Sequence, residues 1–336
     1  MGTSHRRPRG YLSLEEEPIM QNPSIRKLLL AGATALAISP ATQAADPAAC
    51  KTVHFSDVGW SCITATTAVA SMVLEGLGYE PKDSVLSVPV TFTSLANGDI
   101  DAFLGLWLPT QESMIAPYFK DGTIDKVAVN LEGAKYTLAV PKYVHQAGVK
   151  NFADLAKHKD KFNGKIYGIE PGNDGNKIIQ DMIDNNAFGL KGWEVVESSE
   201  QGMLSQVKRE SGKKGWIVFL GWEPHPMNRR FDMDYLAGGD DYFGANFGGA
   251  TVYTLAPKGY TSKCPNAGKL LTNLRFSLAT ENEMMGYMLD DGMDPKAAAK
   301  KLIKNHPELV DQWLQGVTTM DGGGSGAAAV KAHLKM

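Results

Sequence analysis

Apolar and polar positions along the chain form two similar units. The first unit runs from Val53 to about Pro109, and the second runs from Lys165 to about Pro226. Each contains a strand-like segment, a loop, a helical stretch, a second strand, a second helical stretch and a closing apolar run. This alternation predicts an α/β fold with parallel strands.

The expected elements can be assigned within each unit. In the first unit we expect strands in VHFSDVGW, Val85 to Val90 and DAFLGLWLP, with helices over Ile63 to Leu77 and Ser94 to Asn97. In the second unit we expect a strand and loop in KIYGIEPGND, a strand in WEVVESS and a closing strand in WIVFLGWEPHP, with helices over Lys177 to Asn185 and EQGMLSQVKRES.

The closing runs of the two units resemble each other. Phe103 to Pro109 reads FLGLWLP, and Phe219 to Pro224 reads FLGWEP. Both are apolar enough for a buried parallel strand that ends near a tryptophan and a proline. Trp107 and Trp222 are therefore expected just past the carboxyl ends of strands, which is the edge where open α/β sheets bind ligands.

Two further segments, Tyr136 to Lys142 and Tyr253 to Lys258, share the pattern YTLA followed by proline and lysine. We interpret them as a pair of crossover hinge strands between two lobes. One lobe would comprise residues 46–136 and 254–336, and the other residues 137–253. Such a clamp captures a ligand by closing around it.

The end of the chain is predicted to be helical. Helices are expected at Leu270 to Asp290, Asp294 to Asn305 with Asp294 as N-cap, and Pro307 to Gly316, with a last short helix at the end.

The N-terminal region has the pattern of an export signal. Arg26 and Lys27 precede the apolar run from Leu28 to Ile38, and small residues end at Ala44. The run is shorter than the roughly 20 residues of a membrane-spanning helix. We therefore expect residues 1–45 to be an upstream extension plus a cleavable signal peptide, which places the mature protein in the periplasm. Met20 is the expected start codon, and a genuine pre-region before it is the alternative.

Composition excludes several classes of function. The chain is 43% hydrophobic and 21% charged, with a formal net charge of -3. Because it has no basic stripe or zinc-finger pattern, we expect no nucleic-acid partner. The histidines are scattered without metal-ligand spacing, and no nucleophile, base and orienting group can be named together. We therefore expect that the protein is not an enzyme and that it binds neither a metal ion nor a cofactor.

Four aromatic residues follow predicted strands or lie at the hinge, and all should face one cleft: Trp60, Trp107, Tyr136 and Trp222. A rigid aromatic cage suits a quaternary ammonium group, which has no N–H to donate and is attracted to ring faces. The alternative for any single tryptophan is ordinary packing. Trp193, Trp216 and Trp313 are interpreted as core or surface residues.

The segment EPGNDGN, from Glu170 to Asn176, precedes a predicted helix. The free backbone N–H groups of that helix can hold an anionic or hydroxyl end of a ligand, and Asn173 is a candidate donor. The alternative is a plain helix N-cap. Neither the P-loop pattern nor the dinucleotide fingerprint is present.

The chain contains three cysteines, and export permits a disulfide. Cys50 follows the expected mature start, and Cys264 lies in the polar stretch from Thr261 to Pro265. We expect Cys50 and Cys264 to pair and Cys62 to stay unpaired.

Several segments together resemble the periplasmic choline-binding proteins of bacterial ABC transporters, within the glycine betaine/choline family. They are DPAACKTV, FSDVGW, ITATT, LEGLGYEPK, LSVPVT, GAKYTLA, GKIYGIEPGNDGN, EVVESSEQGML, VFLGWEPHPMN and GGDD. The resemblance covers essentially the whole mature chain. It implies a two-lobed type II periplasmic-binding fold, a monomer, and a membrane permease as partner.

The resemblance also implies site residues. The family's aromatic box matches Trp60, Trp107, Tyr136 and Trp222, its polar contact to the free end of the ligand matches Asn173, and its disulfide matches Cys50 and Cys264.

Two positions depart from the family pattern. Cys62 stands where choline-binding members carry an aspartate that contacts the choline hydroxyl, and Leu106 replaces a polar residue. A thiol is a weak donor and is uncharged at its ordinary pKa. One hypothesis is therefore a shift in selectivity toward betaine, carnitine or acetylcholine, and the other is choline held by the cage alone. An alternative ligand is another small amine or amino acid such as γ-aminobutyrate. An alternative role for the protein is that of a chemosensory adaptor that presents its ligand to a receptor.

Overall fold

The computed structural model describes residues 45–336, so the expected signal peptide and the choice between Met1 and Met20 lie outside the described residues. A disulfide joins Cys50 to Cys264, whose Cα atoms are 5.7 Å apart, and Cys62 is free and buried. Within residues 45–336, no helix combines the length and apolar character needed to cross a bilayer.

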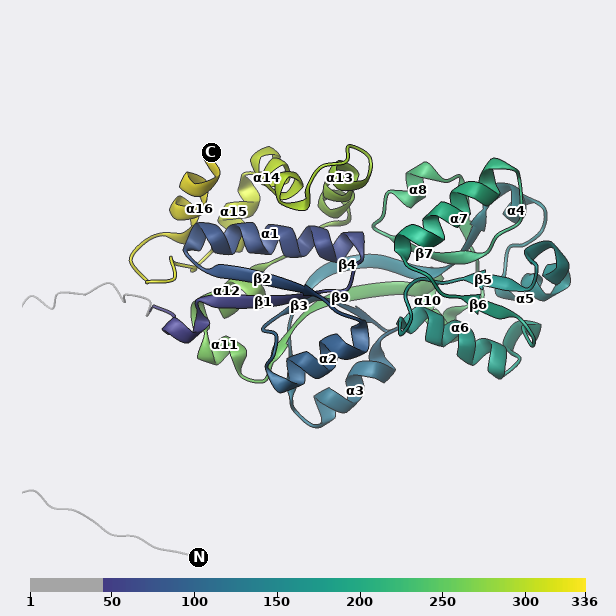
Figure 1. Ribbon diagram of the computed structural model, residues 1–336, viewed down its shortest axis with the longest axis horizontal. Coiled ribbons are helices and arrows are strands. Elements are labelled where there is room, and N and C mark those ends of the chain that lie inside the picture. The colour runs from purple at the N-terminus through teal and green to yellow at the C-terminus, as the bar shows by residue number, and fades with distance from the viewer. Residues whose placement is uncertain (1–44) are drawn as a thin grey trace, which may run out of the picture. The chain divides into compact units, whose positions relative to one another are not determined.

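The fold has two groups of elements joined by long strands (Figure 1). The strands are β1 Thr52–Asp57, β2 Glu80–Val85, β3 Phe103–Leu108, β4 Ile124–Pro141, β5 Lys165–Tyr167, β6 Glu194–Val196, β7 Phe219–Glu223, β8 Met233–Tyr235 and β9 Gly249–Pro257. The α-helices are α1 Ser61–Leu77, α2 Val88–Asn97, α3 Glu112–Lys120, α4 Lys142–Gln146, α5 Phe152–Leu155, α6 Asp174–Asp184, α7 Glu200–Gly212, α8 Met227–Arg230, α9 Asp240–Phe243, α10 Ala245–Gly248, α11 Tyr260–Lys263, α12 Pro265–Asn273, α13 Leu278–Leu289, α14 Pro295–Asn305, α15 Glu308–Trp313 and α16 Gly326–Leu334.

Both predicted units have the expected order of strands and helices. The first unit is β1, α1, β2, α2 and β3, and β1 pairs in parallel with β2. The second unit is β5, α6, β6, α7 and β7, and β5 pairs in parallel with both β6 and β7. The closing strands β3 and β7 are buried along almost their whole length, as their apolar sequences predict.

Strand β4 passes from one group of elements to the other. The larger sheet has the order β3, β9, β4, β7, β5, β6, with β8 also paired to β4. The first part of β4 pairs with β9, and its last part pairs with β7 and β8. The change occurs near Lys135, which lies opposite both Gly249 and Glu223. The expected crossover segments thus belong to β4 and β9, although Tyr253 to Lys258 lies away from the change of partner.

We call the two groups of elements the first and second lobes. The first lobe contains β1 to β3 with α1 to α3 and receives the C-terminal helices α11 to α16, several of which pack on α1 or β4. The second lobe contains α4 to α10 and β5 to β8. The lobe limits proposed from the sequence, after residues 136 and 253, stay a prediction.

Two predicted elements are wrong. The second strand of the first unit is Glu80–Val85 and not Val85 to Val90, because Ser87 is the N-cap of α2 and Pro89 fits its first turn. The single helix expected from Leu270 to Asp290 is two helices, α12 and α13. Ser277 forms a capping box with Thr280 and so starts a new helix at Leu278. Helix α14 begins after its N-cap Asp294, as predicted.

Candidate ligand-binding site

Four aromatic rings surround one cavity between the lobes. Eight residues line it: Trp60, Cys62, Trp107, Gln111, Tyr136, Ile169, Asp174 and Trp222. The structure therefore brings together the four predicted cage residues and Cys62. Each of the four aromatic side chains is buried. The space that these residues enclose is small, and its walls are mainly apolar.

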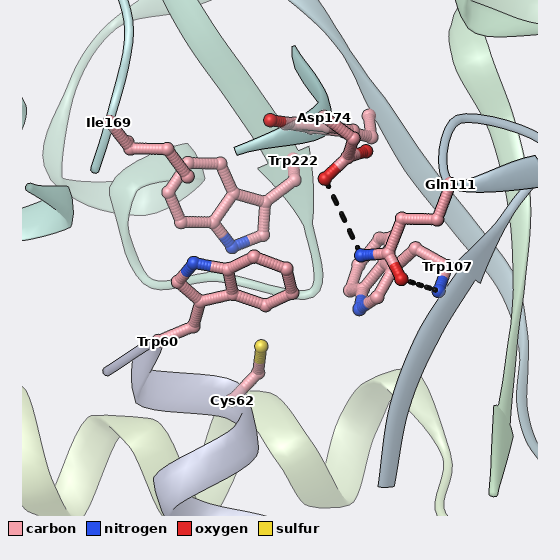
Figure 2. Close-up of a pocket in the computed structure, with 8 residues that line it drawn as sticks. Trp60, Cys62, Trp107, Gln111, Ile169, Asp174 and Trp222 are labelled. Atoms are coloured by element: carbon pink, nitrogen blue, oxygen red, sulfur yellow. Dashed lines mark hydrogen bonds between the residues drawn. The ribbon is translucent and has the colours of Figure 1, made fainter. Parts of the chain in front are cut away.

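Each ring is positioned by a different element. Trp60 is the N-cap of α1, directly after the loop that follows β1. Trp107 lies on β3, Tyr136 on β4 and Trp222 on β7. Figure 2 shows the indole of Trp107 on a different side of the space from those of Trp60 and Trp222.

Tyr136 holds the centre of this arrangement. Its ring lies edge-to-face against Trp107 and Trp222, with both pairs of centroids 6.2 Å apart. Its hydroxyl donates to Oδ1 of Asn173 at 2.8 Å. These contacts fix the ring near the point where β4 changes partner.

The sequence interpretation missed two lining residues, Gln111 and Asp174. Gln111 is the N-cap of α3, and its side-chain amide donates to Oδ1 of Asp174 at 3.4 Å, across the two lobes (Figure 2). Asp174 is the first residue of α6 and is buried. Its Oδ2 is buried without a hydrogen-bond partner. The cavity wall therefore contains an acceptor available to a ligand.

Burial changes the pKa of the two acidic groups at the site. Desolvation raises the pKa of Asp174 to about 6, although the nearby Thr110 hydroxyl and the hydrogen bond from Gln111 oppose the shift. Desolvation also raises the pKa of Glu170 to about 7, against hydrogen bonds from Trp60 and Asn173. A cation in the cavity would favour the charged form of Asp174 and so offset part of the cost of burying it.

Asn173 is not among the residues that line the cavity. It is the N-cap of α6, and its Oδ1 accepts from the backbone N–H groups of Gly175 and Asn176. Its Nδ2 donates to Oε1 of Glu170 at 3.2 Å. Asn173 thus caps α6, as one interpretation of the sequence expected, and its contact with a ligand stays a prediction. The neighbouring Asp174 lines the cavity.

Cys62 is the second residue of α1, and its thiol lies beside the cage rings in Figure 2. Burial raises its pKa well above the usual value, and the charges of Glu281 and Glu200 act in the same direction. The thiol is therefore neutral. Leu106, the other departure from the family pattern, is fully buried in β3 and does not line the cavity.

The other tryptophans lie outside the cage. Trp193 and Trp313 are buried, and Trp216 is partly buried and packs against Phe162. Their interpretation as core or surface residues agrees with these positions.

Comparison with known proteins places the chain in a family. Residues 51–305 match the substrate-binding domain of ABC-type glycine betaine transport systems. A solved ABC-transporter choline-binding protein in complex with choline is 60% identical, with a TM-score of 0.85. That similarity covers 86% of this chain and 100% of the solved chain.

Two curated relatives are also similar. The glycine betaine/carnitine transport binding protein of Listeria monocytogenes is 31% identical over 163 residues, which are 48% of this chain and 53% of that protein. The glycine betaine/proline betaine-binding periplasmic protein of Salmonella typhimurium is 25% identical over 292 residues, covering 75% of this chain and 86% of that protein. The solved neighbour confirms the two-lobed fold expected from the sequence. The chain belongs to the family of substrate-binding domains of ABC-type glycine betaine transport systems.

Proposed function

We propose that this chain is the periplasmic substrate-binding component of an ABC importer and captures a quaternary-ammonium monocation. Trp60, Trp107, Tyr136 and Trp222 would form the cage, and Asp174 would supply the opposing charge. The observation that carries the proposal is the cavity itself, in which four buried rings surround a space whose wall holds one unpartnered carboxylate oxygen.

The cage matches the chemistry of a methylated cation. A quaternary ammonium has no N–H groups, so its burial leaves no donor unsatisfied. Ring faces attract it by about 2 kcal/mol each when desolvated, and several rings together account for much of the roughly 8 kcal/mol of a micromolar complex. The titles of the solved neighbour and the relatives name choline, glycine betaine, carnitine and proline betaine as ligands of those proteins.

Asp174 favours a ligand without a carboxylate. Two like charges about 6 Å apart repel by roughly 3 kcal/mol at an effective dielectric constant of about 20. A betaine or carnitine carboxylate close to Asp174 meets such a repulsion, whereas choline and acetylcholine carry none. Because Cys62 replaces the family's aspartate, one negative charge that would repel a ligand carboxylate is absent. Asp174, which also lines the cavity, still supplies a second such charge. The proposal therefore commits to choline or acetylcholine as the preferred ligand class.

A primary amine such as γ-aminobutyrate fits less well. Its ammonium has three N–H donors, which need acceptors once they are buried. Among the carboxylate and amide oxygens of the cavity wall, only Oδ2 of Asp174 is free, because Oδ1 of Asp174 and Oε1 of Gln111 already accept. The ligand's own carboxylate would also face Asp174.

The test is a titration of the mature protein with choline, acetylcholine, betaine, carnitine and γ-aminobutyrate, followed by tryptophan fluorescence and calorimetry. We expect choline or acetylcholine to bind tightest and to be recovered unchanged, which also excludes catalysis on the ligand. Trp222→Ala should lower affinity at least tenfold, about 1.4 kcal/mol. Trp216→Phe, which lies outside the cavity, is the matched control. Tightest binding of a carboxylated ligand would refute the charge argument, and no binding of any quaternary amine would refute the cage.

Location and partners need separate experiments. Cell fractionation with N-terminal sequencing of the exported protein tests the periplasmic location and cleavage near Ala44. Ligand uptake in cells that lack this chain tests the importer. Normal uptake combined with a lost behavioural response to the ligand would favour the chemosensory adaptor.

A further inference from the structure

We infer that Glu200 is the residue that latches the two lobes together, by capping helix α1 from the opposite lobe. This inference rests on the proposed function, because it concerns how closure around the ligand is stabilised. Glu200 lies on α7 in the second lobe, whereas α1 begins at Ser61 in the first lobe.

Helix α1 has no cap of its own. It runs for 17 residues, and its N-cap is Trp60, whose side chain makes no capping hydrogen bond. The first N–H groups of a helix have no partner within the helix, and that end carries a partial positive charge. Glu200 supplies the missing acceptor: its Oε2 accepts from the backbone N–H of Ser61 at 2.9 Å, and its Oε1 accepts from the hydroxyl of Ser61.

Glu200 is not needed to cap the helix on which it lies. Ser199 is the N-cap of α7, and its hydroxyl accepts from the N–H of Gly202 at 3.0 Å. The carboxylate of Glu200 is therefore free to serve α1. Its side chain is only 1% exposed, so it has left water to make these contacts.

His225 and Gln201 complete the surroundings of Glu200. Nδ1 of His225 accepts from the backbone N–H of Met227 at 2.9 Å, so the ring proton lies on Nε2 and points to Oε1 of Glu200, 3.2 Å away. The side-chain amide of Gln201 donates to the same oxygen at 3.1 Å. In this structure the carboxylate of Glu200 accepts four hydrogen bonds, two from Ser61, one from His225 and one from Gln201.

The latch contacts both sides of the cage. Ser61 lies between Trp60 and Cys62, which both line the cavity. On the other side, the ring of His225 lies edge-to-face on Trp222, with centroids 5.1 Å apart. Glu200 thus joins the backbone that positions Trp60 to the histidine that packs against Trp222. When the lobes separate, water must replace the two hydrogen bonds from Ser61, whereas those from His225 and Gln201 lie within the second lobe and remain. The Ser61 bonds therefore stabilise the form in which the lobes meet.

The test compares Glu200→Ala and Glu200→Gln with Asp294→Ala in the mature chain. Asp294 is the matched control because it also caps a helix, α14, but within its own lobe. Choline affinity is measured by calorimetry, lobe closure by the radius of gyration in solution scattering with and without choline, and stability by the unliganded melting temperature.

We expect Glu200→Ala to weaken choline binding at least tenfold, as the loss of hydrogen bonds to a charged group does. Choline should dissociate faster, and the melting temperature with choline should fall more than the melting temperature without it. Glu200→Gln keeps an acceptor for the Ser61 N–H and should recover part of the affinity. A double-mutant cycle of Glu200→Gln with Ser61→Ala should show coupling between the two positions. Asp294→Ala should lower the melting temperature and leave affinity unchanged.

Two results would overturn the latch: wild-type affinity and closure in Glu200→Ala, or an unliganded melting temperature lowered as much as the liganded one. Failure of the wild-type protein to bind choline would instead count against the proposed function.

Discussion

Tyr136 on β4 and Trp222 on β7 are directly opposite residues of an antiparallel strand pair, and their rings meet edge to face at 6.2 Å. Opposite residues in such a pair point to the same side of the sheet, so both rings reach the cavity together. The pairing also places Tyr136, the central ring of the cage, next to β7 of the second lobe. It lies one residue after Lys135, where β4 changes its pairing partner from β9 to β7.

The ring of Tyr136 should matter more than its hydroxyl. Tyr136→Phe removes the hydrogen bond to Asn173, but it keeps the aromatic face and its two edge contacts. We expect choline affinity to fall by less than about fivefold in Tyr136→Phe, and by about thirtyfold, roughly 2 kcal/mol, in Tyr136→Ala. Calorimetry checks both values. Equal losses in the two variants would mean that the hydroxyl, and not the ring face, supports binding.

Gly175 makes room for Tyr136. A Cβ atom at Gly175 would lie 2.1 Å from the Tyr136 hydroxyl oxygen and 2.9 Å from Cδ1 of Leu220. Gly175→Ala must therefore displace the ring, and overpacking of this kind typically costs about 1–3 kcal/mol. We expect at least a tenfold loss of choline affinity, measured by calorimetry.

The control for this substitution is Gly212→Ala on α7, where an added Cβ meets nothing within 4 Å. Alanine there should leave affinity unchanged and slightly raise the melting temperature. If Gly175→Ala bound choline as tightly as Gly212→Ala, the cage would be looser than the close contact indicates.

Much of this site was predictable because its aromatic residues lie on or soon after recognisable strands, although Trp107 and Trp222 belong to β3 and β7 and do not lie past their ends as the sequence suggested. The sequence does not show which of Asn173 and Asp174 caps α6 and which faces the cavity, because both residue types cap helices. That choice depends on Tyr136, whose hydroxyl donates to the capping oxygen of Asn173. Gln111 was missed because its partner Asp174 is distant in sequence and belongs to the other lobe.

Local sequence patterns do not predict a contact or a strand when the residue or strand that it pairs with is distant in the sequence. Glu200 caps a helix that begins 139 residues earlier, so no local motif identifies it. Strand β2, EPKDSV, is largely exposed and polar, and it is recognisable as a strand only through its pairing with β1. The apolar residues that follow it suggested a strand, but Ser87 and Pro89 begin a helix there.

A carboxylate in place of the Cys62 thiol should lower the stability of the protein and strengthen its recognition of a ligand hydroxyl. In Cys62→Asp the new carboxylate is buried, and desolvation, together with the nearby carboxyl groups of Glu281 and Glu200, disfavours ionisation at this position. We expect a lower melting temperature, a choline-to-acetylcholine affinity ratio shifted toward choline, and weaker betaine binding. Competition titrations with the three ligands check these changes, and Cys62→Asn is the uncharged control. An unchanged ratio in Cys62→Asp would show that position 62 does not contact the free end of the ligand.

Glu281 on α13 should make the folded protein less stable at alkaline pH. It is buried, and desolvation raises its pKa from 4.5 to about 8. Between these two values the folded state holds a proton that the unfolded state releases, so stability falls as pH rises from about 4.5 to about 8 and then levels off. Glu281→Gln removes this dependence. We expect it to raise the free energy of unfolding by roughly 1–3 kcal/mol at pH 9 and to change it little at pH 5.

The control for Glu281 is Glu283→Gln on the same helix. Burial raises the pKa of Glu283, but hydrogen bonds from Tyr287, His306 and Asn305 outweigh that effect and hold the pKa below 4.5. Glu283 therefore contributes stability above its unfolded pKa, which is lost as pH falls through the lower folded value. Its replacement should destabilise the protein at neutral pH, opposite in sign to Glu281→Gln. Urea unfolding from pH 5 to 9 measures both variants, and destabilisation by Glu281→Gln at pH 9 would mean that the buried carboxylate has a stabilising partner.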